Sequence, residues 1–146
     1  MKKAIGAAIM LTAVVALFSV GQIAAQEKPR KVDEYGAIKP EDEEQSLDSY
    51  AIELDNDPQS KAYIITYGGR KSSPGAAKTA SKRVFDFLVT KRAFDPSRVI
   101  RIDGGLREEP FTELWVVPRG ARPPAATATI HPARKTPVKK TTKKGT

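Results

Sequence analysis

The chain has 146 residues, with 25 Lys and Arg against 17 Asp and Glu, and it contains no cysteine. The missing cysteine excludes a disulfide, a thiol nucleophile and a thiolate metal site. The single histidine, His131, lies in a stretch that we do not expect to fold, so the domain offers no imidazole for a catalytic base or a zinc ligand. We therefore expect no cofactor, no metal and no enzymatic activity.

The N-terminus has the pattern of a secretory signal. Lys2 and Lys3 precede an uncharged apolar run over residues 4–20, and Ala24-Ala25 offers small residues for cleavage before Gln26. The alternative is an uncleaved anchor, because a membrane-spanning helix needs about 17–25 residues. The weak hydrophobicity of this Ala- and Gly-rich run favours cleavage, and we expect an exported protein, periplasmic, outer-envelope associated or secreted.

After a leader over residues 26–31, the first expected elements are a short strand and a helix. The strand covers Val32 to Tyr35 and ends at Gly36. Pro40 and the carboxylates that follow it are typical of a first helical turn. One apolar stripe then follows at helical spacing, formed by Leu47, Tyr50, Ala51 and Leu54, before Asn56-Asp57-Pro58 ends the helix.

The next segments predict a strand, a helix and two more strands. Residues 61–67 are β-branched and aromatic, which is typical of a central strand buried on both faces. Ser73 followed by Pro74 predicts a capped helix start, and Lys91-Arg92 suits the last turn of that helix. Its expected buried stripe is Ala77, Ala80, Val84, Phe87 and Leu88. The remaining strands cover residues 98–102, ended by Asp103-Gly104-Gly105, and residues 112–117.

This order predicts an α+β fold, a two-layer sandwich in which two helices cover one face of a mixed β-sheet over residues 32–118. Residues 119–146 hold eight Lys or Arg and no acidic residue, with Pro, Thr and Ala filling most of the rest. Such a segment predicts a disordered basic tail that the fold does not need. Residues 26–118 carry 15 basic and 17 acidic groups, so the positive charge belongs to the ends of the chain.

Over roughly residues 32–117 the pattern resembles the OmpA C-terminal-like, peptidoglycan-associated domain family. The segments that carry the likeness are Val32-Asp33-Glu34-Tyr35, Ile38-Lys39-Pro40, Leu47-Asp48, Ala51, Leu54, Asp57-Pro58, Ile64-Ile65-Thr66-Tyr67-Gly68-Gly69, Phe87-Leu88 and Asp95-Pro96-Ser97-Arg98-Val99. The resemblance implies an envelope protein that binds the diaminopimelate of peptidoglycan through an aspartate and an arginine. Those two positions fall on Arg70 and about Ala80 here, and the loop between them is shorter. The family's late Asn-Arg-Arg stretch falls near residues 111–113. The departures argue against the family's ligand mode, because Arg70 would repel a ligand ammonium.

Two groups of residues are candidate sites. The first is the pair of glycine-containing strand ends, expected at one sheet edge, where basic side chains and a helix N-terminus favour an anion: Gly68, Gly69, Arg70, Lys71, Ser73, Asp103 and Gly104. The structural alternative is that these glycines only form tight turns. The second group would tether the protein to anionic envelope polymers or lipids: Arg134, Lys135, Lys139, Lys140, Lys143 and Lys144.

The sequence thus favours a non-enzymatic envelope module that binds an envelope protein or an anionic envelope surface, with no nucleic acid partner and only peripheral membrane contact. Two alternatives stay open. One is a small enzyme or ligand-binding domain for an anionic substrate at Gly68 and Gly104. The other is peptidoglycan binding retained through altered residues.

The mature protein should begin at Gln26, because small residues at Ala24-Ala25 follow the apolar run. The intact mass of protein recovered from an export-competent host measures this directly. A product that retains Met1 in the membrane fraction would contradict the expectation.

Overall fold

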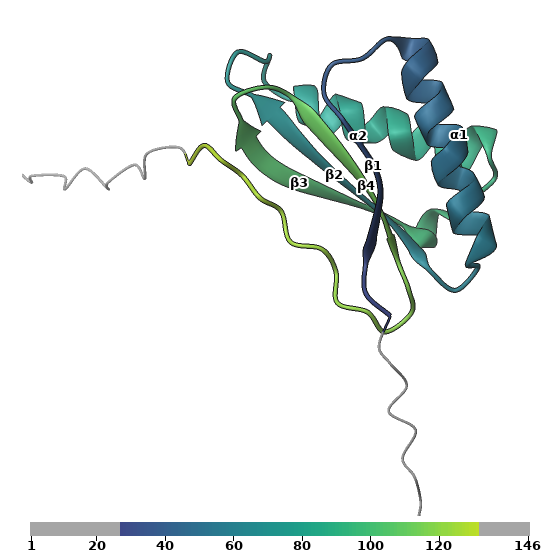
Figure 1. Cartoon of the computed structure of the whole chain (residues 1–146). Coiled ribbons are helices and arrows are strands. Elements are labelled where there is room, and N and C mark those ends of the chain that lie inside the picture. Colours follow the sequence, from purple (N-terminus) through teal and green to yellow (C-terminus); the bar gives the residue numbers. More distant parts are fainter. Residues whose placement is uncertain (1–26, 132–146) are drawn as a thin grey trace, which may run out of the picture.

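The computed structural model describes residues 27–131, in which strands and helices alternate in the order strand, helix, strand, helix, strand, strand (Figure 1). The bounds are β1 (Arg30–Tyr35), α1 (Pro40–Asn56), β2 (Lys61–Gly69), α2 (Ala76–Asp86), a π-helical turn η1 (Phe87–Lys91), a 3-10 turn η2 (Pro96–Arg98), β3 (Val99–Arg107) and β4 (Phe111–Val117). The predicted α+β fold is confirmed.

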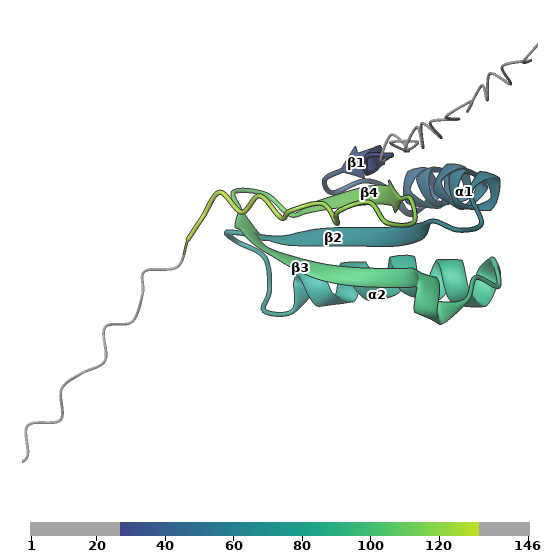
Figure 2. The same ribbon diagram turned by 90° about the horizontal axis from the view of Figure 1, so that it is seen from below.

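The four strands form one mixed sheet in the order β1-β4-β2-β3. Strand β2 is parallel to β3, whereas β4 is antiparallel to both β1 and β2. The carboxyl ends of β2 and β3 therefore lie at the same end of the sheet, together with the start of β4. We call this the upper end of the sheet. Helix α2 lies along β2 and β3, and α1 lies beside β1 and β4 (Figure 2).

Both helices pack on the same face of the sheet and share one apolar core. The predicted stripe of α1 is confirmed, because all four of its residues are buried. The core members of α1, α2, η1 and the two central strands are Leu47, Tyr50, Ala51, Leu54, Val84, Phe87, Leu88, Ala62, Ile64, Leu114 and Val116. The buried hydroxyl of Tyr50 donates to the carbonyl oxygen of Trp115 at 2.7 Å, so α1 is fixed to β4 by a hydrogen bond as well as by packing.

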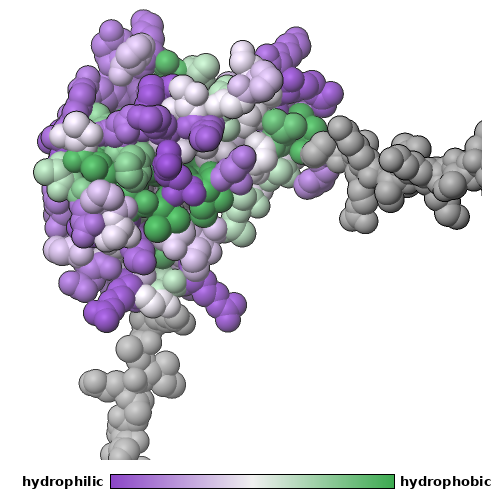
Figure 3. Space-filling model, turned by 180° about the vertical axis from the view of Figure 1, so that it is seen from behind, coloured by the Kyte–Doolittle hydropathy of each residue, from purple (hydrophilic) through white to green (hydrophobic). Residues whose placement is uncertain are grey.

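The outer surfaces of the two helices carry opposite charges that pair with each other. Arg83 of α2 contacts Glu43 of α1, and Arg92 after η1 contacts Asp48 of α1. Lys91 of η1 contacts Glu44 of α1 at 2.8 Å. Seen from the side of α2, the surface is largely hydrophilic with smaller hydrophobic areas (Figure 3). These half-exposed pairs orient the helices more than they stabilise the fold.

Helix α2 begins later and ends earlier than the sequence predicted. Its N-cap is Gly75, in the left-handed region with φ of 85°, and no side chain caps the helix. Ser73 instead accepts the amide hydrogen of Ala76 with its carbonyl oxygen. The expected serine cap was therefore wrong, because the proline after Ser73 is followed by a glycine that makes the turn. The α-helical part ends at Asp86, and Lys91 lies in the π-helical turn that follows.

The expected strand ends at the glycine pairs were also wrong, because β2 continues to Gly69 and β3 continues to Arg107. The register changes from Thr66 opposite Asp103 to Gly68 opposite Leu106, so β3 carries one additional residue, a β-bulge at Gly104-Gly105. A Cβ atom on Gly104 would lie 2.4 Å from the ring of Tyr67. Glycine is required there by packing across the sheet.

The segment after β4 crosses the face of the sheet that the helices leave open (Figure 1). We call residues 119–131 the strap. Its Ile130 forms an antiparallel bridge with Leu106 at the end of β3, and the backbone amide of Thr127 donates to the Tyr67 hydroxyl at 3.1 Å. Ala121, Pro124, Ala128 and Ile130 are half-buried. The sequence placed these residues in a tail that the fold does not need, and these contacts contradict that expectation for residues 119–131.

Removing residues 119–146 should lower the free energy of unfolding by about 1–3 kcal/mol, because hydrogen bonds are lost and Tyr67 becomes exposed. Removing only residues 132–146 should leave stability unchanged. Thermal denaturation followed by circular dichroism compares the two truncations, and the first should melt several degrees lower. Equal midpoints would show that the strap does not stabilise the domain.

Candidate functional site

A cleft of about 290 Å³ lies at the upper end of the sheet, between the start of α2 and the loops that follow β1 and precede β4. We call it the upper cleft. Its lining residues are Tyr35, Gly36, Ala37, Ile38, Glu43, Tyr67, Ser72, Ala76, Ala77, Ala80, Arg83, Pro110, Phe111 and Thr112. Small alanines on α2 leave the space open, while Phe111 and Pro110 supply apolar surface. A second, more open groove of about 670 Å³ runs between α1 and α2.

One carboxylate and one guanidinium stand in the upper cleft and bind each other. Arg83 donates to both oxygens of Glu43 at 3.1 Å, in a bidentate arrangement. The Tyr35 hydroxyl donates to the same carboxylate at 3.3 Å. Burial, with the charge of Glu43, raises the pKa of the Tyr35 hydroxyl far above its ordinary value, so this group stays a neutral donor. The hydrogen bonds to Glu43 also raise the pKa of Arg83.

The first turn of α2 faces this cleft through Ala76 and Ala77. No side chain caps the turn, and the first amides of any helix lack partners within the helix. Ser72 takes part in the preceding turn, where its hydroxyl oxygen accepts the amide hydrogen of Gly69 at 3.0 Å. The cleft therefore offers a paired carboxylate and guanidinium beside a helix start that favours negative charge.

The structure does not bring the sequence-predicted ligand residues together in this cleft. Arg70 is exposed and forms a bidentate ion pair with Glu108, at 2.8 and 2.6 Å. Lys71 and Ser73 do not line the cleft. Asp103 is exposed on β3, where its carboxylate accepts the amide hydrogen of Gly105 at 2.9 Å. Arg70 lies outside the cleft and is neutralised by Glu108, so it does not repel a ligand ammonium there.

The glycines of the predicted site have a structural role. Gly68 and Gly69 are ladder residues of β2, and a Cβ on Gly69 would lie 2.7 Å from Pro110. Together with Gly104 under Tyr67, they allow the strand ends to pack closely. Ala80, the other position singled out by the resemblance, does line the cleft. The six tether residues between Arg134 and Lys144 lie outside the described residues.

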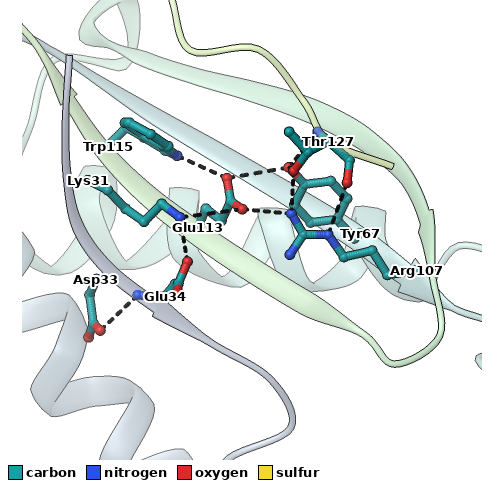
Figure 4. A network of polar contacts seen from close by, with 8 residues as sticks. All are labelled: Lys31, Asp33, Glu34, Tyr67, Arg107, Glu113, Trp115 and Thr127. Atoms are coloured by element: carbon teal, nitrogen blue, oxygen red, sulfur yellow. Dashed lines mark hydrogen bonds and ion pairs between the residues drawn. The ribbon is translucent and has the colours of Figure 1, made fainter. Parts of the chain in front are cut away.

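A buried ionic network occupies the opposite, strap-covered face of the sheet, and we call it the Glu113 network (Figure 4). Glu113 of β4 is 4% exposed. Its carboxylate accepts hydrogen bonds from Arg107 at 2.8 Å, from the Trp115 indole at 3.1 Å and from the Tyr67 hydroxyl at 3.3 Å. Arg107 also donates to the Thr127 hydroxyl at 2.7 Å, so the network fastens the strap.

Burial by itself would raise the pKa of Glu113, but the hydrogen bonds from Arg107 and Trp115 and the charge of Lys31 outweigh it. The net pKa lies below the ordinary value of a glutamate. Lys31 of β1 reaches this carboxylate at 3.7 Å and also stands over the Trp115 ring. This network was not predicted from the sequence. The available signal was a single carboxylate inside an otherwise largely apolar strand.

Within residues 27–131, no group of three or more His, Asp or Glu side chains is arranged to hold a metal ion. The helices among these residues are too short or too polar to cross a membrane. Comparison of the chain with protein-family models and with curated proteins finds no match.

The change Glu113→Gln should lower the free energy of unfolding by about 2 kcal/mol at pH 7, because Arg107 loses its buried partner. Because the pKa of Glu113 is lower in the folded than in the unfolded state, its carboxylate stabilises the fold at pH values above the ordinary glutamate pKa of about 4.3. This contribution is lost as the pH falls through the folded-state pKa. The difference in free energy of unfolding between Glu113→Gln and the unchanged protein should therefore be smaller at about pH 3. Urea unfolding followed by Trp115 fluorescence measures both points.

The control for this measurement is Glu108→Gln. The pKa of Glu108 is also lowered, chiefly by the hydrogen bond from Arg70, but the pair is exposed to solvent. This variant should change stability little. Equal losses in the two variants, or a loss in Glu113→Gln that does not depend on pH, would contradict the role given to Glu113.

Proposed function

We propose that the chain is an exported, non-enzymatic binding module of the cell envelope, with an OmpA-like domain and a basic tail that attaches it to an anionic surface. The order of the elements is compatible with the resemblance to that family. The distribution of charge along the chain supports the tether. Residues 26–118 have a small negative net charge, while the C-terminal segment carries only positive charges.

One observation carries this proposal: the upper cleft and the end of the strap, from which the last basic residues of the chain continue, share one end of the sheet. The strap is bound at Leu106, near the end of β3, through the backbone amides of Thr129 and Ile130. The next basic residues of the chain follow shortly after His131. The start of β1 lies at the opposite end of the sheet (Figure 1). A surface that attracts the tail therefore lies on the side of the upper cleft.

The attraction expected from the tail is substantial. Each Lys or Arg close to an anionic surface contributes about 1 kcal/mol at low salt. The six basic residues between Arg134 and Lys144 are enough to hold the protein at such a surface without a specific pocket. Because exposed charges are screened within about 10 Å at 0.1 M salt, this attachment must weaken as salt rises.

A second function is favoured by the Glu43 and Arg83 pair in the upper cleft. The resembled family recognises a ligand ammonium with a carboxylate and a ligand carboxylate with an arginine. Arg83 lies one helical turn beyond Ala80 and on the same side of α2. A zwitterionic wall peptide that exchanges partners with the Glu43 and Arg83 pair would satisfy both charges. This is wall binding through altered residues.

Sedimentation with purified peptidoglycan and with anionic vesicles separates the two functions. The full chain, exported and purified, should pellet with both at low salt and be released at about 0.5 M salt. A variant in which Arg134, Lys135, Lys139, Lys140, Lys143 and Lys144 are changed to Gln should lose this binding while keeping its chain length.

The two functions predict different binding of the variants to peptidoglycan. If the tail alone attaches the protein, the variant Arg83→Gln should pellet like the unchanged chain. If the upper cleft binds the wall, the tail variant should still pellet with peptidoglycan in a saturable, salt-resistant way, and Arg83→Gln should remove that binding. Failure of the unchanged chain to bind either material at low salt would reject the envelope module.

A further inference from the structure

The outer edge of β3 is the feature from which we draw a further inference. Strand β3 lies at the edge of the sheet and pairs with β2 on its inner side. Among the described residues, its outer side is paired only at Leu106, through the bridge to Ile130 of the strap. The amide of Val99 donates to the carbonyl oxygen of Pro96, and the amide of Gly105 donates to the Asp103 carboxylate. The outer-side backbone groups between them, from Ile100 to Gly104, are thus free to pair with another strand.

Two opposite charges lie two residues apart on this edge, on the helix-covered face of the sheet. Val99 belongs to the core on that face, and side chains alternate along a strand, so Arg101 and Asp103 follow on the same face. The Arg101 guanidinium stands 4.9 Å from the centre of the Phe85 ring of α2. Both residues are exposed.

The length of the free edge selects one register for an antiparallel pair of two β3 strands. The 3-10 turn η2 ends at Arg98, and the strap closes the edge at Leu106, so the free stretch is centred on Ile102. An antiparallel pair that uses the whole stretch has its two-fold axis at Ile102. In that register, Arg101 of each copy is directly opposite Asp103 of the other.

Pairs whose two-fold axis lies one residue away from Ile102 are disfavoured. A pair centred on Arg101 places two arginines opposite each other, and a pair centred on Asp103 places two aspartates opposite each other. Directly opposed like charges destabilise a strand pair, whereas opposite charges stabilise it. The register that fits the free length is therefore also the register that matches the charges.

We propose that two copies of this chain associate through their β3 strands, antiparallel and centred on Ile102, so that two four-stranded sheets become one continuous sheet. The interface is isologous, as in most symmetric dimers. It contains two symmetry-related pairs between Arg101 and Asp103. Half-buried Ile100 and Ile102 add apolar contact on the other face.

The alternative role of these charges is to keep the edge free of partners. A charge-exchange experiment distinguishes the two roles. Arg101→Asp places two aspartates opposite each other in a homodimer, and Asp103→Arg places two arginines opposite each other. A mixture of the two variants restores both pairs, because the aspartate introduced at position 101 of one copy then lies opposite the arginine introduced at position 103 of the other.

The experiment measures the mass of the exported, purified full chain by analytical ultracentrifugation between about 1 and 200 μM. We expect a monomer–dimer equilibrium for the unchanged protein. Each single variant should weaken association by about tenfold or more, because both attractive pairs become repulsive. The equimolar mixture should recover the dimer. Arg30→Asp, which makes the same change of charge on the opposite edge strand β1, should associate like the unchanged protein.

Circular dichroism of each variant checks the fold, since Asp103→Arg also removes the acceptor for the Gly105 amide. The mixture controls for the loss of this hydrogen bond. If the dimer is recovered from two variants that each associate weakly, pairing of the β3 strands explains the recovery. An unchanged protein that stays monomeric throughout the range overturns the proposal. So does a dimer that neither single variant weakens, or two weakened variants whose mixture does not recover.

Discussion

Burial of β2 on both faces is the constraint on which the rest of the structure depends. Seven residues of this strand are buried, on both sides of the sheet. The helices cover one side, where Ala62 and Ile64 join the core. The other side, with Ile65 and Tyr67, requires a second cover, since an exposed apolar strand face is unfavourable in water. The strap and the side chains of the Glu113 network provide it.

The sequence predicted the elements whose signals are local. The stripe of α1 follows from the helical spacing of Leu47, Tyr50, Ala51 and Leu54. Burial of most of residues 62–67 follows from their β-branched and aromatic character. The two helices on one face follow from the crossover rule. These inferences require only neighbours within one or two turns of the chain. They were enough to predict the α+β class.

The sequence could not predict features that depend on contacts between distant residues. Composition marks residues 119–131 as disordered, yet a few contacts from Thr127 and Ile130 suffice to hold them. Arg70 looked available for a ligand because its partner Glu108 lies 38 residues away. The glycines resembled turn residues, whereas Gly104 accommodates the ring of Tyr67. In each case the deciding neighbour belongs to another element.

The β-bulge at Gly104-Gly105 decides on which face of the sheet a charge is placed. Before the bulge, the odd-numbered residues of β3 point toward the helices, as Arg101 does over Phe85. The additional residue reverses this parity, so Arg107 stands over the Tyr67 ring on the open face. A β3 shorter by one glycine would turn the guanidinium toward the apolar core and leave Glu113 without it. The number of residues in β3, as well as the chemistry of the side chains, therefore determines whether the Glu113 network can form.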